Sequence, residues 1–214
     1  MNPQTKPKAA TPARRPLIGL SVNVPEGGGA KELVAALLLA RDAGVRLLFK
    51  DLAWRDLEPA PGAYDFRPVE EFTRGLTTLD CRGYVLIKTL DTNNRTLPDD
   101  LQKRPFDDPA VRARFAALLR ALVPKLTERI DHISLGNECD IYLGEHPDET
   151  EPFAGFVEQG RRTLRAQRPG LPVGVTTTVG GLRARPDHRS ADRRPGVPRH
   201  GVRRERHHHP RRAS

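Results

Sequence analysis

Residues 108–136 read DPAVRARFAALLRALVPKLTERIDHISLG, a helical pattern followed at once by a short apolar strand. Asp108 and Pro109 are typical of a helix start, with a side chain that caps the first turn and a proline inside it. We expect a helix over 108–129. The apolar run in 130–136 predicts a buried strand that ends at Gly136. A helix that leads directly into a buried strand is typical of a parallel α/β fold.

The same alternation extends to both sides of this stretch. Apolar runs predict strands at 17–23, 45–54, 84–90, 130–136 and 172–179. Periodic segments predict helices at 30–44, 67–83, 108–129 and 149–170. Alternating strands and helices of this size predict a parallel sheet with helical crossovers, either an open doubly wound sheet or a (β/α)8 barrel.

Charge divides the chain into three segments. The net charge is +9, but residues 1–16 carry +4 and residues 183–214 carry +8, which leaves −3 for residues 17–182. We expect 1–16 to be disordered, 17–182 to form one domain, and 183–214 to be a disordered Arg/His/Pro-rich tail. Strong positive charge at first suggests an acidic partner, yet the predicted domain itself is mildly acidic.

The tail has three interpretations. It contains eleven Arg and no Lys, five of the seven His of the chain, and no apolar periodicity. It can be a basic segment that binds nucleic acid, a solvated linker, or the product of a GC-rich gene read out of frame. The abrupt change after a strand and the use of Arg without Lys favour the third interpretation. We read the triple His at 207–209 as part of the same bias and not as a metal site.

The remaining composition argues against several classes of protein. Two cysteines, Cys81 and Cys139, imply neither a disulfide framework nor a metal cluster, and we expect no cofactor and no metal. No stretch approaches the ~20 apolar residues of a membrane span. The N-terminus is basic but has no apolar core of a signal peptide, which favours a cytoplasmic location if residue 1 is the true start.

Polar side chains follow the predicted strands, where parallel α/β folds bind their ligands. This set consists of Asn23, Lys50, Asp51, Trp54, Asp91, Asn93, Asn94, Asn137, Glu138, Asp140 and Thr176 to Thr178. It is rich in carboxylates and poor in positive charge, so it suits a neutral ligand rich in hydroxyl groups. The three glycines of NVPEGGGA (23–30) are weak support for a phosphate site and equally fit a flexible loop.

Two motifs resemble those of clan A glycoside hydrolases, which are (β/α)8 barrels. The segment LAWRDLEPAPGAYDF (52–66) is similar to the segment after their second strand, with matches at Trp54, Glu58, Pro59, Pro61, Gly62, Tyr64, Asp65 and Phe66. Their fourth strand ends in Asn-Glu, and Gly136-Asn137-Glu138 stands at the end of the fourth predicted strand here. The resemblance covers about residues 17–180 and does not identify the family or the sugar.

The resemblance implies roles for a few residues. Glu138 would be the acid/base of a retaining mechanism, and Asn137 would hydrogen-bond the sugar 2-hydroxyl. Trp54 and Tyr64 would offer aromatic surface, although packing of their loop is the stronger interpretation, and Glu58 equally fits a carboxylate that binds backbone amides. Lys50, Asp51, Asp91 and Asn93 are candidate substrate-binding residues. For Asn137-Glu138, the alternative is an Asx-type turn that closes the strand.

The sequence departs from the clan in one respect. A retaining glycosidase needs a second carboxylate about 5–5.5 Å from the first, and in this clan the nucleophile is a Glu at the end of the seventh strand. Only five strands are recognisable, and after residue 180 the only Glu is Glu205 in the tail. We therefore expect an incomplete barrel with the acid/base and without the nucleophile, cut off by a frameshift or a false gene end. Such a chain should be inactive and prone to self-association through open sheet edges.

Two alternatives from other classes remain. The chain can be a non-catalytic protein that binds nucleic acid through its Arg-rich tail and not through the domain. It can also be another (β/α)8 enzyme, an isomerase or lyase, although no metal-ligand cluster supports this. We expect a carbohydrate partner and no membrane partner.

Overall fold

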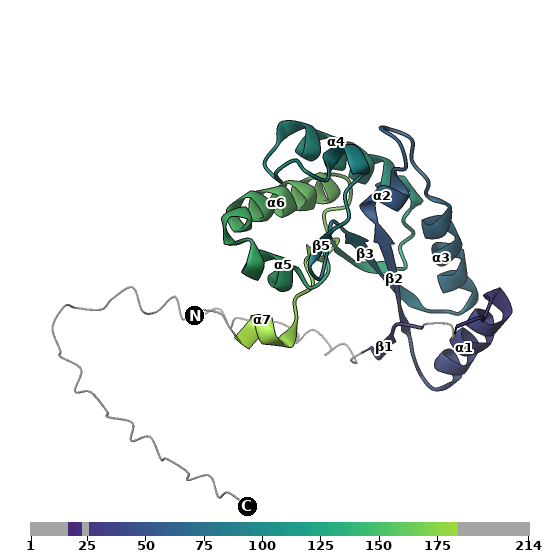
Figure 1. The fold of residues 1–214 in the computed structure, drawn as a ribbon. Helices are drawn as coiled ribbons and strands as arrows, with labels where there is room; N and C mark the ends of the chain where they lie inside the picture. Colours follow the sequence, from purple (N-terminus) through teal and green to yellow (C-terminus); the bar gives the residue numbers. More distant parts are fainter. Residues whose placement is uncertain (1–16, 23–25, 184–214) are drawn as a thin grey trace, which may run out of the picture. The chain divides into compact units, whose positions relative to one another are not determined.

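Five parallel strands form the sheet at the centre of the computed structural model, which describes residues 17–22 and 26–183. The strands are β1 (Gly19–Leu20), β2 (Leu47–Ala53), β3 (Arg82–Lys88), β6 (Ile130–Ser134) and β7 (Val173–Gly174). The crossovers contain α1 (Ala30–Asp42), α3 (Arg67–Thr78), α4 (Pro109–Leu122) and α6 (Thr150–Gln167). Figure 1 shows these helices along the sheet.

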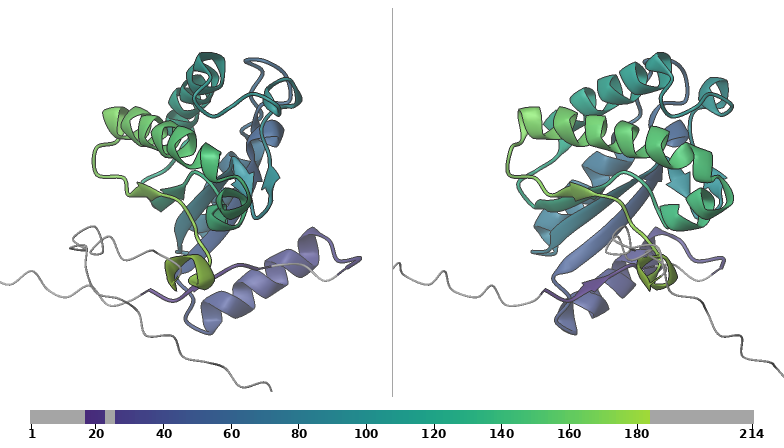
Figure 2. Two further views of the ribbon diagram at one scale, coloured as in Figure 1. Left: turned by 60° about the vertical axis from the view of Figure 1, so that its left-hand side comes forward. Right: turned by 90° about the vertical axis from the view of Figure 1, so that its left-hand side faces the viewer.

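Strand order distinguishes the two architectures that the sequence allowed. The order in the sheet is β1-β2-β3-β6-β7, so each new strand is added beside the preceding one. A doubly wound sheet reverses its strand order at a switch point, whereas a (β/α)8 barrel does not. The fold is therefore a partial (β/α)8 barrel with five parallel strands in its described part, seen from two further sides in Figure 2.

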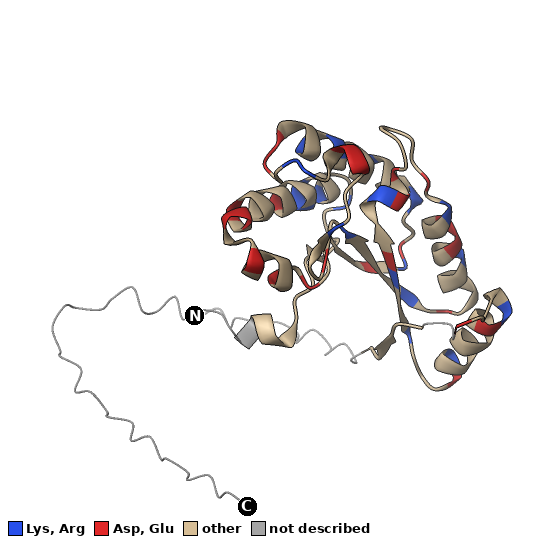
Figure 3. Cartoon of the chain, in the orientation of Figure 1, with Lys and Arg blue, Asp and Glu red and all other residues tan. Residues whose placement is uncertain are grey.

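The outward face of the sheet packs against the helices. Val85, Ile87 and Ile133 are fully buried there, together with Leu118 and Leu119 of α4. Each buried aliphatic side chain contributes about 1.5–3 kcal/mol to folding. Figure 3 shows that basic and acidic residues are both scattered over the described part.

Several short elements complete the described part. These are α2 (Trp54–Leu57), the antiparallel pair β4 (Leu90–Asp91) and β5 (Asn94–Arg95), α5 (Cys139–Glu145), α7 (Val179–Arg183), and single 3-10 turns at Asp99–Leu101, Val123–Lys125 and Pro147–Glu149. The β4–β5 hairpin and α5 were not predicted. Both matter for function because they lie directly after the third and fourth parallel strands.

Several element boundaries differ from the prediction. The helix expected over 67–83 ends at Thr78, and β3 begins at Arg82, because Asp80 takes a left-handed turn with φ 50°. The helix expected over 108–129 ends at Leu122, where a 3-10 turn that contains Pro124 follows. The edge strands are shorter than expected, with two residues each in β1 and β7. The Asp108 cap is confirmed, since its Oδ1 accepts from the amide of Ala110 at 2.7 Å.

No helix among the described residues is long and apolar enough to cross a membrane. The expectations for 1–16 and 184–214, which include the Arg-rich tail and its triple His, concern residues outside the described part of the chain.

Candidate functional site

A chain of polar contacts joins three neighbouring strands at their carboxyl ends. The Lys88 ammonium at the end of β3 lies 3.0 Å from an oxygen of Asp51 on β2 and 2.9 Å from Oδ2 of Asp91 in β4. Oδ1 of Asp91 accepts a hydrogen bond of 2.9 Å from the side-chain amide of Asn137, just after β6. Four of the strand-end side chains are thus linked by direct contacts.

Glu138 directly follows Asn137 and has a left-handed backbone conformation. Its φ and ψ are 46° and 42°, in the left-handed region, and it caps the start of α5. Thr92 is also left-handed, with φ 58°, and its hydroxyl lies 2.8 Å from Oε2 of Glu138. Non-glycine residues in this region are strained, and such strain is concentrated at functional sites. The half-buried carboxyl group of Glu138 is therefore held by a partner from the neighbouring hairpin.

Backbone hydrogen bonds hold the two segments in register. The amide of Asn137 donates to the carbonyl of Leu90 at 2.9 Å, and the amide of Thr92 donates to the carbonyl of Asn137 at 3.0 Å. The side chain of Asn137 donates to Asp91, far away in sequence, and not to its own backbone. The segment after β6 is therefore hydrogen-bonded to the β4–β5 hairpin through both backbone and side chain. The structure does not show the Asx-type turn that was considered as an alternative.

Gly136 and Cys139 pack so closely that a side chain at position 136 would overlap the Cys139 thiol. A Cβ at Gly136 would lie 2.5 Å from Sγ of Cys139 and 3.3 Å from the ring of Phe153. Only glycine leaves room for this packing. Burial raises the pKa of the Cys139 thiol to about 12, so the thiol stays protonated and unreactive at neutral pH. Cys139 is a packing residue that seats the loop carrying Glu138.

The charges at the strand ends stabilise one another. Partial burial works to raise the pKa of Asp91, but the hydrogen bonds from Lys88 and Asn137 outweigh it and leave that pKa below its ordinary value. Partial burial works to lower the pKa of Lys88, and Asp91 and Asp51 outweigh it and leave that pKa raised. At neutral pH, Lys88 is therefore charged and Asp91 is ionised.

The inward face of the sheet continues below this cluster as an aromatic and hydroxyl layer. The ring of Tyr84 packs edge-on against Phe49 and His132, with centroids 5.1 and 5.0 Å away. The Tyr84 hydroxyl lies 2.9 Å from Oγ1 of Thr176, which lies 3.2 Å from the hydroxyl of Ser134. Burial lowers the pKa of His132, so its imidazole is neutral at physiological pH.

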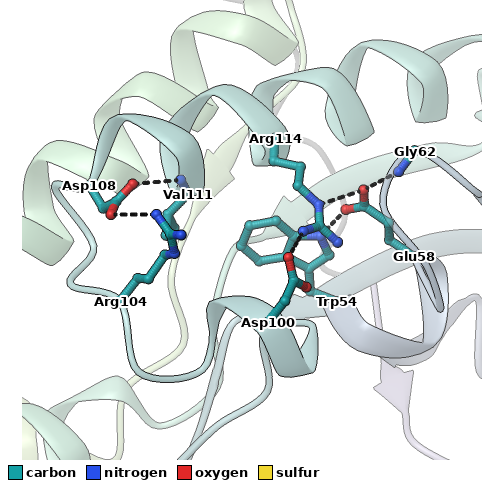
Figure 4. Close-up of polar contacts among 8 residues, drawn as sticks. All are labelled: Trp54, Glu58, Gly62, Asp100, Arg104, Asp108, Val111 and Arg114. Atoms are coloured by element: carbon teal, nitrogen blue, oxygen red, sulfur yellow. Dashed lines mark hydrogen bonds and ion pairs between the residues drawn. The ribbon is translucent and has the colours of Figure 1, made fainter.

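The expectation that Trp54 binds substrate is wrong for this structure. Its indole is 0% exposed, and it packs against Phe115 at 4.8 Å between ring centroids. Its Nε1 donates to Oε2 of Glu58 at 2.8 Å (Figure 4). A side chain enclosed by the core on all sides has no surface to offer a sugar.

Glu58 is fully buried and ties together the loop that resembles the clan motif. Its Oε1 accepts from the amide of Gly62 at 2.8 Å and from Nε of Arg114 at 2.9 Å, and Arg114 also pairs with Asp100 (Figure 4). Tyr64 stacks on Phe66 at 5.5 Å. The packing interpretation thus accounts for Trp54, Glu58 and Tyr64 alike: the motif builds the loop.

Two further candidates lie away from the cluster. Side chains alternate along a strand, so Lys50 is on the face of β2 opposite Asp51. A cavity of about 380 Å³ between β2, α1 and α3 is lined by both residues. Asn93 is exposed in the β4–β5 turn, where its Oδ1 accepts from the side chain of Asn94 at 2.8 Å. The described structure gives neither residue a contact with Asn137 or Glu138.

Lys88 and Thr92 were not predicted as site residues. A signal for Lys88 was present, because it follows Tyr84 and Leu86 at the strand period of two and so shares their inward face. Thr92 belongs to the hairpin DTNN, whose consecutive asparagines are typical turn residues.

The described residues contain no group of three or more His, Cys, Asp or Glu side chains arranged to hold a metal ion. At the start of α1, the amide of Gly29 is occupied by the carboxylate of Glu32 at 2.8 Å, and the first residues of the glycine loop lie outside the described ranges.

This architecture, with a polar cluster at the carboxyl ends of its strands, matches part of the (β/α)8 barrel of clan A glycoside hydrolases, including members of family GH5. The chain is similar to the exo-β-1,4-mannosidase Op5Man5 from Opitutaceae bacterium strain TAV5, with a TM-score of 0.64 and 20% identity, covering 75% of this chain and 31% of that chain.

Two other solved structures show the same likeness. A GH5_18 protein from Streptomyces cattleya in complex with GlcNAc gives a TM-score of 0.55 at 20% identity, covering 67% of this chain and 39% of that one. The β-glucosidase 1317 gives 0.54 at 13% identity, covering 66% and 44%. The chain thus spans less than half the length of these structures, and at such identities the likeness establishes the fold. No family model and no curated protein matches the sequence.

Proposed function

We propose that this chain carries the acid/base half of a retaining glycosidase site and binds a neutral glycoside. One observation carries the proposal: the fourth parallel strand along the chain, β6, delivers Asn137 and Glu138 to the carboxyl edge of a partial (β/α)8 barrel. Ligands of such barrels bind at this edge. In the proposed role, Glu138 protonates the departing glycosidic oxygen and then takes a proton from the incoming water.

Asn137 is proposed to bind the sugar 2-hydroxyl. One of its amide hydrogens is directed to Asp91, so Oδ1 and the second amide hydrogen remain for a ligand. A hydrogen bond at the 2-hydroxyl strengthens as the oxocarbenium-like transition state forms.

The charge of the cluster favours an uncharged sugar. Asp51 and Asp91 contribute two carboxylates against the single ammonium of Lys88. An anionic sugar would be repelled by this excess of negative charge. Two of the similar structures are an exo-β-1,4-mannosidase and a GlcNAc complex, which makes β-mannosides and β-N-acetylglucosaminides the first glycosides to test.

The described carboxylates near Glu138 are engaged in other contacts. Asp51 and Asp91 both pair with Lys88, and Asp140 accepts from the amide of Thr178 at 2.8 Å. A retaining mechanism needs a second carboxylate that is free to attack the anomeric carbon. The resemblance assigns this carboxylate to a seventh strand, and the described part has five parallel strands. We therefore propose that the 214-residue chain alone does not turn over glycosides.

Two assays test the proposal. The first measures release of 4-nitrophenol from its β-mannoside, β-glucoside and β-N-acetylglucosaminide by the purified chain. We expect no turnover above that of Glu138→Gln. Turnover that Glu138→Gln abolishes would show that the chain already holds a complete site.

The second assay supplies a nucleophile from solution. Azide attacks the anomeric carbon, the glycosidic C–O bond breaks, and Glu138 gives its proton to the departing phenolate oxygen. With the corresponding unsubstituted phenyl glycosides, whose departing oxygen needs a proton, we expect an azide-dependent glycosyl azide of inverted configuration, which Glu138→Gln abolishes. Glu145→Gln is the matched control, since Glu145 is exposed at the end of the same helix α5. If no glycosyl azide forms from any of these glycosides, the acid/base role is contradicted.

A further inference from the structure

Lys88 occupies a central position in the cluster, although it does not touch Asn137 or Glu138. Its ammonium bridges Asp51 and Asp91, and the side chain of Lys88 is only 19% exposed. Asp51 is 51% exposed and Asp91 31%, so the pair with Asp91 is the better shielded of the two. Shielded charge pairs are weakened less by solvent and salt.

We propose that Lys88 is a positioning residue that, through its ion pair with Asp91, preserves the orientation of the Asn137 amide at acidic pH. The proposal deepens the proposed function, and it rests on that function only for the role of Asn137 toward a sugar.

The physical reason is that an amide side chain has two nearly isosteric ends. An ionised Asp91 is only an acceptor, so the NH2 group of Asn137 must face it, and Oδ1 faces away. A protonated Asp91 would carry a donor and would accept either end of the amide. Lys88 extends to lower pH the range in which Asp91 is ionised and this ambiguity is absent, so that Oδ1 of Asn137 remains available to a ligand hydroxyl there.

Lys88 is not needed to hold the main chain of Asn137 in place. The main chain of Asn137 is already held on both sides by the Leu90 carbonyl and the Thr92 amide, at 2.9 and 3.0 Å. These contacts do not involve Lys88. What Lys88 adds is control over one side-chain rotation.

The test is an NMR titration of the whole chain. The side-chain amide of Asn137 is identified by its loss in Asn137→Asp, and its chemical shift is followed as pH is lowered. In the wild type we expect a transition below the ordinary range of an aspartate. In Lys88→Met the midpoint moves up by about one to three pH units, the usual effect of removing an opposite charge at this distance. Lys88→Arg keeps the charge and leaves the midpoint close to that of the wild type.

Lys50→Met is the matched control. It removes the same charge from the same sheet, but on the opposite face, beside the cavity under α1 and α3. An unchanged midpoint in Lys88→Met, or an equal change in Lys50→Met, would overturn the proposal. If Lys88→Met does not fold, the titration of the Lys88 side chain is compared between wild type and Asp91→Asn. The proposal requires the Lys88 pKa to fall in Asp91→Asn, and no change there overturns it.

This outcome is independent of the glycosidase proposal. The titration reads the coupling between Lys88, Asp91 and Asn137 without any ligand. If the titration midpoint shifts as expected but no glycosyl azide forms, the positioning role stands and the proposed function is contradicted. If glycosyl azide forms but the midpoint does not shift, the proposed function stands and the positioning role is contradicted.

Discussion

Thr92 and Glu138 face each other across two loops, both in the left-handed backbone region, with the Thr92 hydroxyl 2.8 Å from the Glu138 carboxylate. The residues that precede them are also in contact. The side chain of Asp91 accepts a hydrogen bond from Asn137, and the two residues form a backbone bridge. Two consecutive residues of the β4–β5 hairpin thus hold two consecutive residues after β6. The hairpin is the support on which the proposed acid/base rests.

The free-energy cost of the left-handed backbone at Glu138 can be measured by comparing the stability of two variants. A left-handed L-residue costs roughly 1–2 kcal/mol, and glycine does not incur this cost. We therefore expect Glu138→Gly to be more stable than Glu138→Ala by about 1 kcal/mol in urea unfolding. At Glu158, inside helix α6 and not among the left-handed residues, the order should reverse, because glycine weakens a helix by about 1 kcal/mol relative to alanine. The same order at both sites would contradict this account.

Gly136 and Cys139 should be energetically coupled. We expect Gly136→Ala to reduce the free energy of unfolding by about 1–3 kcal/mol, because its Cβ would overlap Sγ of Cys139. In a Cys139→Ala background the same change should cost less, since the overlapping atom is gone. A double-mutant cycle gives this coupling directly. Gly144→Ala in α5 is the control: its Cβ meets nothing within 4 Å, so it should not destabilise.

The buried pair Glu58–Arg114 should matter far more than an exposed pair. Glu58 is fully buried, so Glu58→Ala leaves Arg114 and the Trp54 indole without their partner. We expect a loss of about 3–5 kcal/mol, the usual result of breaking a buried pair from one side. Glu70→Ala removes the partner of Lys125 in a pair whose side chains are 38% and 42% exposed, and it should cost below about 1 kcal/mol. Equal losses would show that the loop does not depend on Glu58.

His132 should make stability depend on pH. Burial lowers its pKa in the folded chain, so below its ordinary pKa of about 6.5 the unfolded chain binds a proton that the folded chain resists. Stability therefore falls as pH drops through this range. His132→Gln removes this contribution, and thermal unfolding from pH 7.5 to 5 should show a weaker dependence in the variant. Parallel curves for the two proteins would exclude the effect.

The open edges of the described sheet predict self-association. Strands β1 and β7 each pair with one neighbour only, and Leu20 in β1 and Val175 directly after β7 are 47% and 38% exposed. Unpaired edges with apolar side chains invite pairing with another chain. We expect concentration-dependent oligomers in sedimentation velocity, reduced by Leu20→Lys with Val175→Lys. Leu39→Lys, at an exposed position of α1 outside both edge strands, is the control. A monomer at every concentration would refute this.

Much of the fold was predictable because it depends on local patterns. Apolar runs, the Asp108 cap and the spacing of strands and helices are properties of short segments, and they predict a parallel sheet with Glu138 and Asn137 at one edge. The sequence alone left the barrel and the doubly wound sheet as alternatives. Strand order distinguished them, and it depends on contacts between segments tens of residues apart.

The candidate site also has features that the sequence predicts and features that depend on tertiary contacts. Glu138, Asn137, Asp51 and Asp91 could be proposed from the sequence because each follows a predicted strand. Whether a strand side chain faces the barrel interior or the helices separates Lys88 from Lys50. Trp54 begins the short helix α2, and tertiary packing encloses it in the core. The sequence therefore specifies which residue types reach the carboxyl edge. Their pairing arises only when the folded chain brings hairpin β4–β5 against the end of β6, since no local pattern encodes contacts across 46 residues.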